Sequence, residues 1–206
     1  MDLIKIEQEV RGNRVAIVGN AQSLLRTSFG RDIDAHDIVV RLNRGVVSPS
    51  ARSHGKKTDI WCFSVLDQMT PVLKRANYRY RIGMSPKQVN LPDNEEIVYP
   101  SEYWSRLSAL IGARPSVGCM ALDLISRFQP YSVTLYGFDF KETKSYYEKH
   151  HNFGQHDFAA ERLFAKTLVS KNGWEIIAAD AGHRSPLTVL ASLTGALKGF
   201  GKGIMK

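Results

Sequence analysis

The sequence has 206 residues, of which 28 are Lys or Arg and 20 are Asp or Glu, giving a formal net charge of +8. With 43% hydrophobic and 23% charged residues, the composition is that of a soluble globular protein and excludes disordered and collagen-like chains. The length fits one domain spanning residues 1–206. The excess of positive charge suggests a polyanionic partner: nucleic acid, an anionic membrane surface or a phosphate-bearing small molecule.

Taken in chain order, strand-like and helix-like stretches alternate. The apolar run at 14–18 ends at Gly19 and predicts a buried strand, and residues 22–28 predict a helix that stops at Gly30. Further strands are predicted at 37–42, 58–63, 78–82, 96–99, 132–136 and 174–178. Further helices are predicted at 116–128 and 158–171, and a last one is capped by Ser185-Pro186.

This alternation predicts an α/β fold, namely a single Rossmann-like domain with a mostly parallel sheet covered by helices on both faces. Such sheets bind ligands in a crevice at the carboxyl ends of their strands. We therefore expect functional residues in the segments that follow the predicted strands.

The first such segment reads Val18-Gly19-Asn20-Ala21-Gln22-Ser23. Gly19 permits a tight turn, and the free N–H groups of the following helix would face an anion, with the Asn20 amide beside them. The alternative is a plain strand-to-helix turn capped by Asn20. The motif lacks the second and third glycines of GxGxxG, which argues against NAD.

The second segment contains Arg41 and Asn43 at the end of a predicted strand. Two residues apart in a strand, their side chains point to one face and would both reach the crevice. The aspartates before this strand, at positions 32, 34 and 37, have an alternative role in capping backbone N–H groups of a solvated turn.

The third segment runs from Arg114-Pro-Ser116-Val117-Gly118 into a predicted helix. Ser116 is a natural N-cap, and Gly118 leaves the first helical turn bare, so exposed N–H groups and a hydroxyl would form a second anion cradle. Helix capping alone also explains Ser116.

The fourth segment holds three histidines, His150, His151 and His156. No further Cys or HExxH helix completes four ligands, which argues against zinc. A general base fits better, since imidazole titrates near neutrality. Glu161 lies five residues after His156, about 140° around an ideal helix. The two converge only if His156 precedes the helix and Asp157 is its N-cap.

In this order, the four segments resemble the sialyltransferase family, the eukaryotic-type CMP-sialic acid glycosyltransferases of family 29. VAIVGNAQSLLRTSFGRDIDAHDIVVRLN is similar to that family's large motif, and RPSVGCMALDLISRFQPYSVTLYGFDF to its small motif. SYYEKHHNFGQHDFAAE is similar to the aromatic third motif and the final His-x4-Glu motif. The resemblance spans residues 14–164, and residues 64–113 carry little of it.

The resemblance implies a role for each matching position. His156 matches the catalytic base that deprotonates the acceptor hydroxyl, and Glu161 is its partner in the motif. Asn20 and Asn43 match residues that hold the CMP group of the donor. The candidate donor-binding residues are Gly19, Asn20, Ser23, Arg41, Asn43, Ser116, Val117, Gly118, Gly137, Phe138, His150 and His151.

Several positions depart from the family pattern. Val117 replaces the usual Thr, and Ser145 stands where many members have a histidine, which leaves His150 or His151 as a substitute for phosphate contact. The cysteines of the family's disulfide are missing, since Cys62 and Cys119 stand elsewhere. This loss and the absence of a signal sequence, anchor and stem suggest a compact microbial or viral relative in a reducing cytoplasm.

By resemblance, the expected enzyme is an inverting, metal-independent glycosyltransferase without a cofactor. It would transfer sialic acid or a related ulosonic acid such as Kdo from a CMP-sugar to a glycan or lipid-linked oligosaccharide, as in the synthesis of lipopolysaccharide or capsule. No residue separates sialic acid from Kdo.

The alternative is a non-catalytic basic module that binds nucleic acid or an anionic membrane. Its best support is the tail 186–206, where leucines at helical spacing precede three lysines. This tail would bring the protein to the inner face of a membrane, or it is a terminal core helix with a frayed basic end. Residues 78–81 interleave Tyr and Arg, as nucleic-acid binders do, but equally fit a strand.

Overall fold

The computed structural model describes residues 3–85 and 97–178. The strands in these ranges are β1 (Arg14–Val18), β2 (Ile38–Leu42), β3 (Ile60–Phe63), β4 (Tyr80–Gly83), β5 (Ile97–Val98), β6 (Ser132–Tyr136) and β7 (Glu175–Ile177). The α-helices are α1 (Leu3–Val10), α2 (Gly30–Asp34), α3 (Ala51–His54), α4 (Thr70–Leu73), α5 (Ser101–Ile111), α6 (Val117–Arg127) and α7 (Phe158–Asn172). Short 3-10 helices occur at η1 (Gln22–Arg26), η2 (Asn43–Val46) and η3 (Leu66–Met69).

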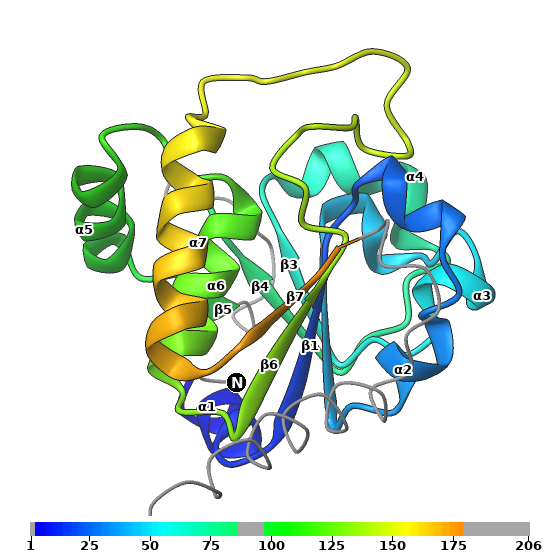
Figure 1. Ribbon diagram of the computed structural model, residues 1–206, viewed down its shortest axis with the longest axis horizontal. Coiled ribbons are helices and arrows are strands. Elements are labelled where there is room, and N and C mark those ends of the chain that lie inside the picture. Colours follow the sequence, from blue (N-terminus) through cyan, green and yellow to red (C-terminus); the bar gives the residue numbers. More distant parts are fainter. Residues whose placement is uncertain (1–2, 86–96, 179–206) are drawn as a thin grey trace, which may run out of the picture.

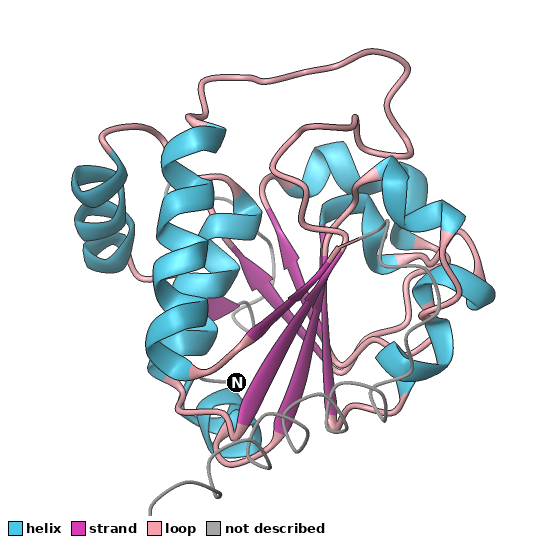
Figure 2. Ribbon diagram, viewed as in Figure 1, coloured by secondary structure: helices cyan, strands magenta, loops and turns pink. Residues whose placement is uncertain are grey.

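The described strands form one parallel sheet in the order β5-β4-β3-β2-β1-β6-β7 (Figure 1). The winding direction reverses at β1, which has β2 on one side and β6 on the other. Such a reversal opens a crevice at the carboxyl ends of the two central strands. The predicted α/β, Rossmann-like fold class is confirmed, with helices on both sides of the sheet (Figure 2).

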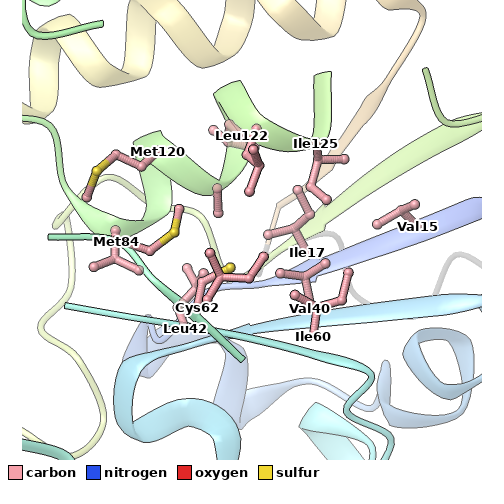
Figure 3. Packing of buried hydrophobic residues seen from close by; sticks show 14 of the residues in the cluster. Val15, Ile17, Val40, Leu42, Ile60, Cys62, Met84, Met120, Leu122 and Ile125 are labelled. Carbon is pink, nitrogen blue, oxygen red and sulfur yellow. The ribbon is translucent and has the colours of Figure 1, made fainter. Parts of the chain in front are cut away.

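The central strands are mostly apolar because both of their faces are covered. Val15 and Ile17 of β1 pack in the large core cluster under α6 (Figure 3). Ala16 and Val18 pack on the opposite face of the sheet with Ile33 of α2. Successive side chains of a strand alternate between the two faces, so each face receives half of the run. The core thereby anchors the strand ends on which the cavity described below is built.

Most predicted elements agree closely with the structure. The strands predicted at 14–18 and 132–136 have those bounds, and the other strands begin one or two residues later than predicted. The long helices also agree, since Ser116 caps α6 through its side chain and α7 begins at Phe158. Local β-branched runs and caps were sufficient signals for these elements.

One helix prediction was wrong. Residues 22–28 form only the 3-10 helix η1, and Gly30 begins α2 rather than ending a helix. Gly30 is required there for a different reason: a methyl group on it would lie 1.9 Å from the carbonyl oxygen of Ala51. The helices α1 and α5 were not predicted.

Of the two features that supported a basic binding module, one is described by the structure and the other is not. Residues 78–81 lead into β4, and Tyr80 is buried with its hydroxyl bonded to Glu9. The C-terminal segment 186–206, including the predicted helix at Ser185-Pro186, lies outside the described residues. Within residues 3–85 and 97–178, no helix combines the length and the apolar character that a membrane crossing requires.

The loops after β1 and β6 meet at a pair of glycines. A methyl group on Gly19 would lie 2.3 Å from the carbonyl oxygen of Gly137. We expect Gly19→Ala to lower the free energy of unfolding by about 2 kcal/mol, because the two backbones must separate. Urea unfolding measures this loss.

Gly118→Ala is the matched control, since its methyl group meets nothing closer than the Phe138 ring at 3.3 Å. Its expected loss of stability is below about 1 kcal/mol, because a ring can shift and alanine favours a helix. Equal stability of Gly19→Ala and the unmodified chain would contradict the close approach.

Candidate active site

A cavity of about 490 Å³ opens at the carboxyl ends of the strands, where the winding reverses. The segments after β1, β2, β3 and β4 line it, together with the start of α6 and the long connection between β6 and α7. The course of that connection along the backbone can be followed in Figure 1. Ten of the candidate residues line this cavity: Gly19, Asn20, Asn43, Ser116, Val117, Gly118, Gly137, Phe138, His156 and Glu161. Four candidates do not line it: Ser23, Arg41, His150 and His151.

The two asparagines from neighbouring strands lie in the cavity wall. The side-chain nitrogen of Asn20 donates to the carbonyl oxygen of Leu42 at 3.0 Å and to the Tyr147 hydroxyl at 3.2 Å. The side-chain oxygen of Asn43 accepts from the Ser64 N–H at 3.0 Å. These bonds fix both amides, and the nitrogen of Asn43 has no acceptor within the described ranges.

The first predicted anion cradle is wrong. The N–H of Gln22 donates to the carbonyl oxygen of Lys144, and the N–H of Ser23 donates to the Thr143 hydroxyl. The Ser23 hydroxyl donates to Asp139. These N–H groups therefore hold the 139–148 loop instead of facing an anion, a long-range contact that no local motif indicates.

The second predicted cradle is present at the start of α6. The Ser116 hydroxyl accepts from the N–H of Cys119 and caps the helix as predicted. The N–H groups of Val117 and Gly118, in the first turn, have no acceptor among the described residues. Both residues line the cavity, so two donors and the positive end of an 11-residue helix face it.

His156 and Glu161 converge on the turn before α6. As predicted, His156 precedes α7, and Asp157 caps that helix by accepting from the N–H groups of Ala159 and Ala160. The Nδ1 atom of His156 lies 2.9 Å from the carbonyl oxygen of Arg114. A carbonyl only accepts hydrogen bonds, so Nδ1 carries the proton and the neutral ring keeps a lone pair on Nε2.

Glu161 also binds the turn that precedes α6. It is 3% exposed, and its carboxylate accepts from the Ser116 N–H at 2.7 Å and from the Ser116 hydroxyl at 2.6 Å. Burial raises the pKa of this carboxyl, while the two bonds from Ser116 act in the opposite direction. Glu161 therefore holds the helix cap, and His156 presents its Nε2 beside that cap.

The placement of Arg41 in the crevice is wrong. Arg41 is 1% exposed and lies outside the cavity, donating to the carbonyl oxygens of Lys57 at 2.9 Å and His54 at 2.5 Å. The alternation that paired it with Asn43 ends at Leu42, because Asn43 has a φ of 47° and begins η2. Burial lowers the pKa of Arg41 to about 10, so it remains charged at neutral pH.

The neighbouring histidine makes stability depend on pH. His54 is buried against the Tyr146 ring, and burial, with a contribution from Arg41, lowers its pKa from 6.5 to about 4. Between these values the unfolded chain binds a proton that the folded chain excludes. The free energy of unfolding should therefore fall by about 3 kcal/mol as pH drops from 7 to 4.

Urea unfolding at several pH values tests this dependence. In His54→Leu, the fall in the free energy of unfolding between pH 7 and pH 4 that is due to His54 should disappear. His150→Leu is the matched control, since His150 is exposed and its removal should leave the slope unchanged. An unchanged slope in His54→Leu would contradict a buried, neutral His54.

His150 and His151 were wrongly predicted to contact phosphate, since both are exposed outside the cavity. His151 instead stacks on Phe153, with ring centroids 5.6 Å apart. Ser145, which stands in place of the family histidine, does line the cavity, in a polar cluster that also contains Lys141, Tyr147 and Glu148. From the sequence, Ser145 was discussed by itself, and Tyr147 and Glu148 were matched only as part of the third motif. Lys141 was not singled out, because the loop that assembles this cluster has no regular periodicity.

The cysteines and acidic residues suggest no metal or disulfide chemistry in the described structure. Cys62 and Cys119 are free and buried, and burial raises the pKa of both thiols, that of Cys62 to about 12. No group of three or more His, Cys, Asp or Glu side chains in residues 3–85 and 97–178 is placed to hold a metal ion. Metal independence itself stays a prediction.

Comparison with known proteins identifies related chains. The sequence model of glycosyltransferase family 29 (sialyltransferase) matches residues 4–80. Sialyltransferase-like protein 5 of Oryza sativa subsp. japonica is 36% identical over 80 residues, which cover 36% of this chain and 17% of the rice protein. This chain thus spans about a sixth of the length of that relative.

Solved structures share the fold over most of the chain. A mammalian sialyltransferase has a TM-score of 0.61 at 19% identity, covering 88% of this chain and 78% of its own. The sialyltransferase CstII from Campylobacter jejuni, solved with cytidine-5′-monophosphate, also has a TM-score of 0.61, at 14% identity and covering 87% and 84%. The parallel sheet and its helices therefore recur in these enzymes.

Proposed function

From the assignment of this chain to the sialyltransferase family, which these matches support, we propose that it is a CMP-sugar-dependent glycosyltransferase. It transfers sialic acid or a related ulosonic acid such as Kdo from a CMP donor to a hydroxyl of a glycan. The observation that carries the proposal is one cavity, at the carboxyl ends of the central strands, that holds both fixed polar donors and a histidine with a free ring nitrogen.

The donor side of the cavity suits a phosphorylated nucleotide. The N–H groups of Val117 and Gly118 at the helix start offer hydrogen bonds to an anion, and a helix N-terminus favours negative charge. Asn20 and Asn43 add polar groups for the nucleotide. The Campylobacter enzyme of the same fold was solved with CMP, which supports this nucleotide as the carrier of the sugar.

The acceptor side is the side of His156. Its Nε2 takes the proton of the acceptor hydroxyl as the oxygen attacks the anomeric carbon. The bond from that carbon to the phosphate oxygen breaks, and its electron pair leaves with CMP. Attack and departure on opposite faces of the sugar invert the anomeric centre. The donors at α6 stabilise the charge on the leaving phosphate.

Glu161 supports this reaction through the turn that precedes α6. Its two bonds to Ser116 position the turn that carries both the helix cap and, through the Arg114 carbonyl, the imidazole of His156. Glu161 is therefore a positioning residue. The Nδ1 bond to Arg114 directs Nε2 toward the cavity in the tautomer that accepts a proton.

A thermal-shift screen against CMP, CDP, UDP and NAD tests the donor class. A ligand at 100 times its dissociation constant stabilises the fold by about 2.7 kcal/mol, so binding is measurable without turnover. We expect stabilisation by CMP and not by UDP or NAD. Salt-sensitive retention on DNA without stabilisation by CMP would favour the basic-module alternative instead. Release of CMP from CMP-sialic acid or CMP-Kdo then identifies the sugar.

A further inference from the structure

The charged side chains around the cavity are not equally free to bind a ligand. Six acidic, basic or histidine side chains line it: Arg114, Asp139, Lys141, Glu148, His156 and Glu161. Glu161 is bound to Ser116, and Asp139 accepts from the Ser23 hydroxyl, the Thr143 N–H and the Thr143 hydroxyl. The two cations of this set are Arg114 and Lys141, and Lys141 is paired with Glu148.

Lys141 projects into the polar cluster on the nucleotide side. Its Nζ lies 3.1 Å from the Ser145 hydroxyl and 2.8 Å from a carboxylate oxygen of Glu148, and its side chain is 17% exposed. An ammonium group has three N–H donors, so one has no protein acceptor in the described residues. In the same cluster, the Tyr147 hydroxyl is bonded to Asn20.

The backbone holds this ammonium in place. Phe140 and Lys141 are consecutive non-glycine residues with positive φ, 52° and 67°, a conformation that costs energy and often occurs at functional sites. Asp139 fixes one end of the turn through its bonds to Thr143. An antiparallel bridge between Ala21 and Ser145 ties the other end to the loop after β1. These contacts therefore hold the turn 139–145, and with it Lys141, in one conformation.

Arg114 occupies a different side of the cavity. Its carbonyl oxygen binds the ring of His156, and its side chain is exposed. In an in-line displacement the attacking hydroxyl and the leaving phosphate lie on opposite sides of the anomeric carbon. Arg114 thus belongs to the turn that carries the base, whereas Lys141 belongs to the cluster to which Asn20, a residue assigned to the nucleotide, is bonded.

We propose that Lys141 binds the phosphate of the nucleotide donor and stabilises the charge that develops there as the sugar leaves. This inference rests on the proposed function. The ammonium keeps its proton and donates a hydrogen bond, while the phosphate oxygen receives the electron pair of the broken bond to the sugar. Glu148 holds the ammonium in position, and the third N–H of Lys141 meets the phosphate.

Binding of CMP and of cytidine, which lacks the phosphate, separates this role from general effects on the site. Isothermal titration should show that Lys141→Met weakens CMP binding by about 10- to 100-fold and leaves cytidine binding unchanged. Lys144→Met is the matched control, since Lys144 is on the same loop, its side chain donates to the Lys149 carbonyl, and it lies outside the cavity. The Lys144→Met variant should keep the preference for CMP over cytidine.

A double variant tests whether Lys141 merely neutralises Glu148. In Lys141→Met combined with Glu148→Gln, the preference for CMP should remain lost, because no cation is left near the phosphate. A restored preference would overturn the inference. Lys141→Arg, which keeps the charge, should recover part of the preference for CMP over cytidine. The unfolding temperature of each variant shows whether it is folded.

The outcomes also distinguish a failure of the proposed function from a failure of the role proposed for Lys141. If the unmodified chain binds neither CMP nor cytidine, both the proposed function and this inference fail. If the unmodified chain prefers CMP and Lys141→Met keeps that preference at full strength, the function stands and the role of Lys141 is rejected. With CMP-sialic acid as donor, Lys141→Met should lower kcat as well as raise KM.

Discussion

His156→Ala is expected to lower the rate of sugar transfer by about 10²- to 10⁴-fold, the usual contribution of a general base. The imidazole is bonded through Nδ1 to the Arg114 carbonyl, so Nε2 is the atom that accepts the proton. CMP affinity should be unchanged within about twofold, because the groups assigned to the nucleotide are Asn20, Asn43 and the N–H groups at the start of α6, and His156 is bonded to none of them. Initial rates of CMP release and titration with CMP measure the two quantities separately.

The matched control is His36→Ala. His36 is half-buried and bonds to the Asp32 carbonyl and to Thr134, outside the cavity. Its removal should leave the rate of transfer unchanged. Full turnover by His156→Ala would reject the assignment of the base, and loss of CMP binding together with turnover would indicate a structural role instead.

Glu161→Ala is expected to damage both stability and catalysis. The substitution leaves the Ser116 N–H and hydroxyl without their acceptor in a buried site. We expect a loss of about 3 kcal/mol in the free energy of unfolding, since each bond to a buried charge contributes about 1.5–3 kcal/mol. Turnover should fall by about 100-fold, because a shifted turn displaces the base.

The pattern across variants separates positioning from catalysis. Glu161→Ala should weaken CMP binding as well as turnover, because Ser116 starts the helix that faces the nucleotide, whereas His156→Ala should spare CMP. Glu161→Gln should recover part of the CMP binding and part of the turnover, since its amide oxygen still accepts from the Ser116 N–H. Glu175→Ala, on an exposed residue of β7, is the control for loss of an acidic side chain. Normal stability of Glu161→Ala would contradict the clamp on Ser116.

The elements were predictable where the signal is local. The β-branched runs of β1 and β6 indicated buried strands with the observed bounds, because a strand covered on both faces needs apolar residues at every position. Asp157 was recognisable as a cap, which placed His156 before α7 and directed it toward the strand ends. Ser116 carried the same kind of local signal for α6.

The errors arose where the backbone turns or where distant segments meet. A strand pattern paired Arg41 with Asn43, but the positive φ of Asn43 ends the alternation and Arg41 is buried elsewhere. The N–H groups after β1 were expected to bind an anion, yet the 139–148 loop takes them up. Lys141 was not singled out, because its place in the cavity depends on that loop.

The central claim is that this chain transfers a sugar from a CMP donor, and CMP release tests it most directly. The full chain is incubated with a panel of glycan acceptors and either CMP-sialic acid or CMP-Kdo, and free CMP and glycosylated product are measured over time. We predict that CMP and product accumulate together with one of the two donors and that His156→Ala slows the formation of both by about 10²- to 10⁴-fold. Absence of product from both donors across the panel, with no stabilisation of the chain by CMP, would contradict the account.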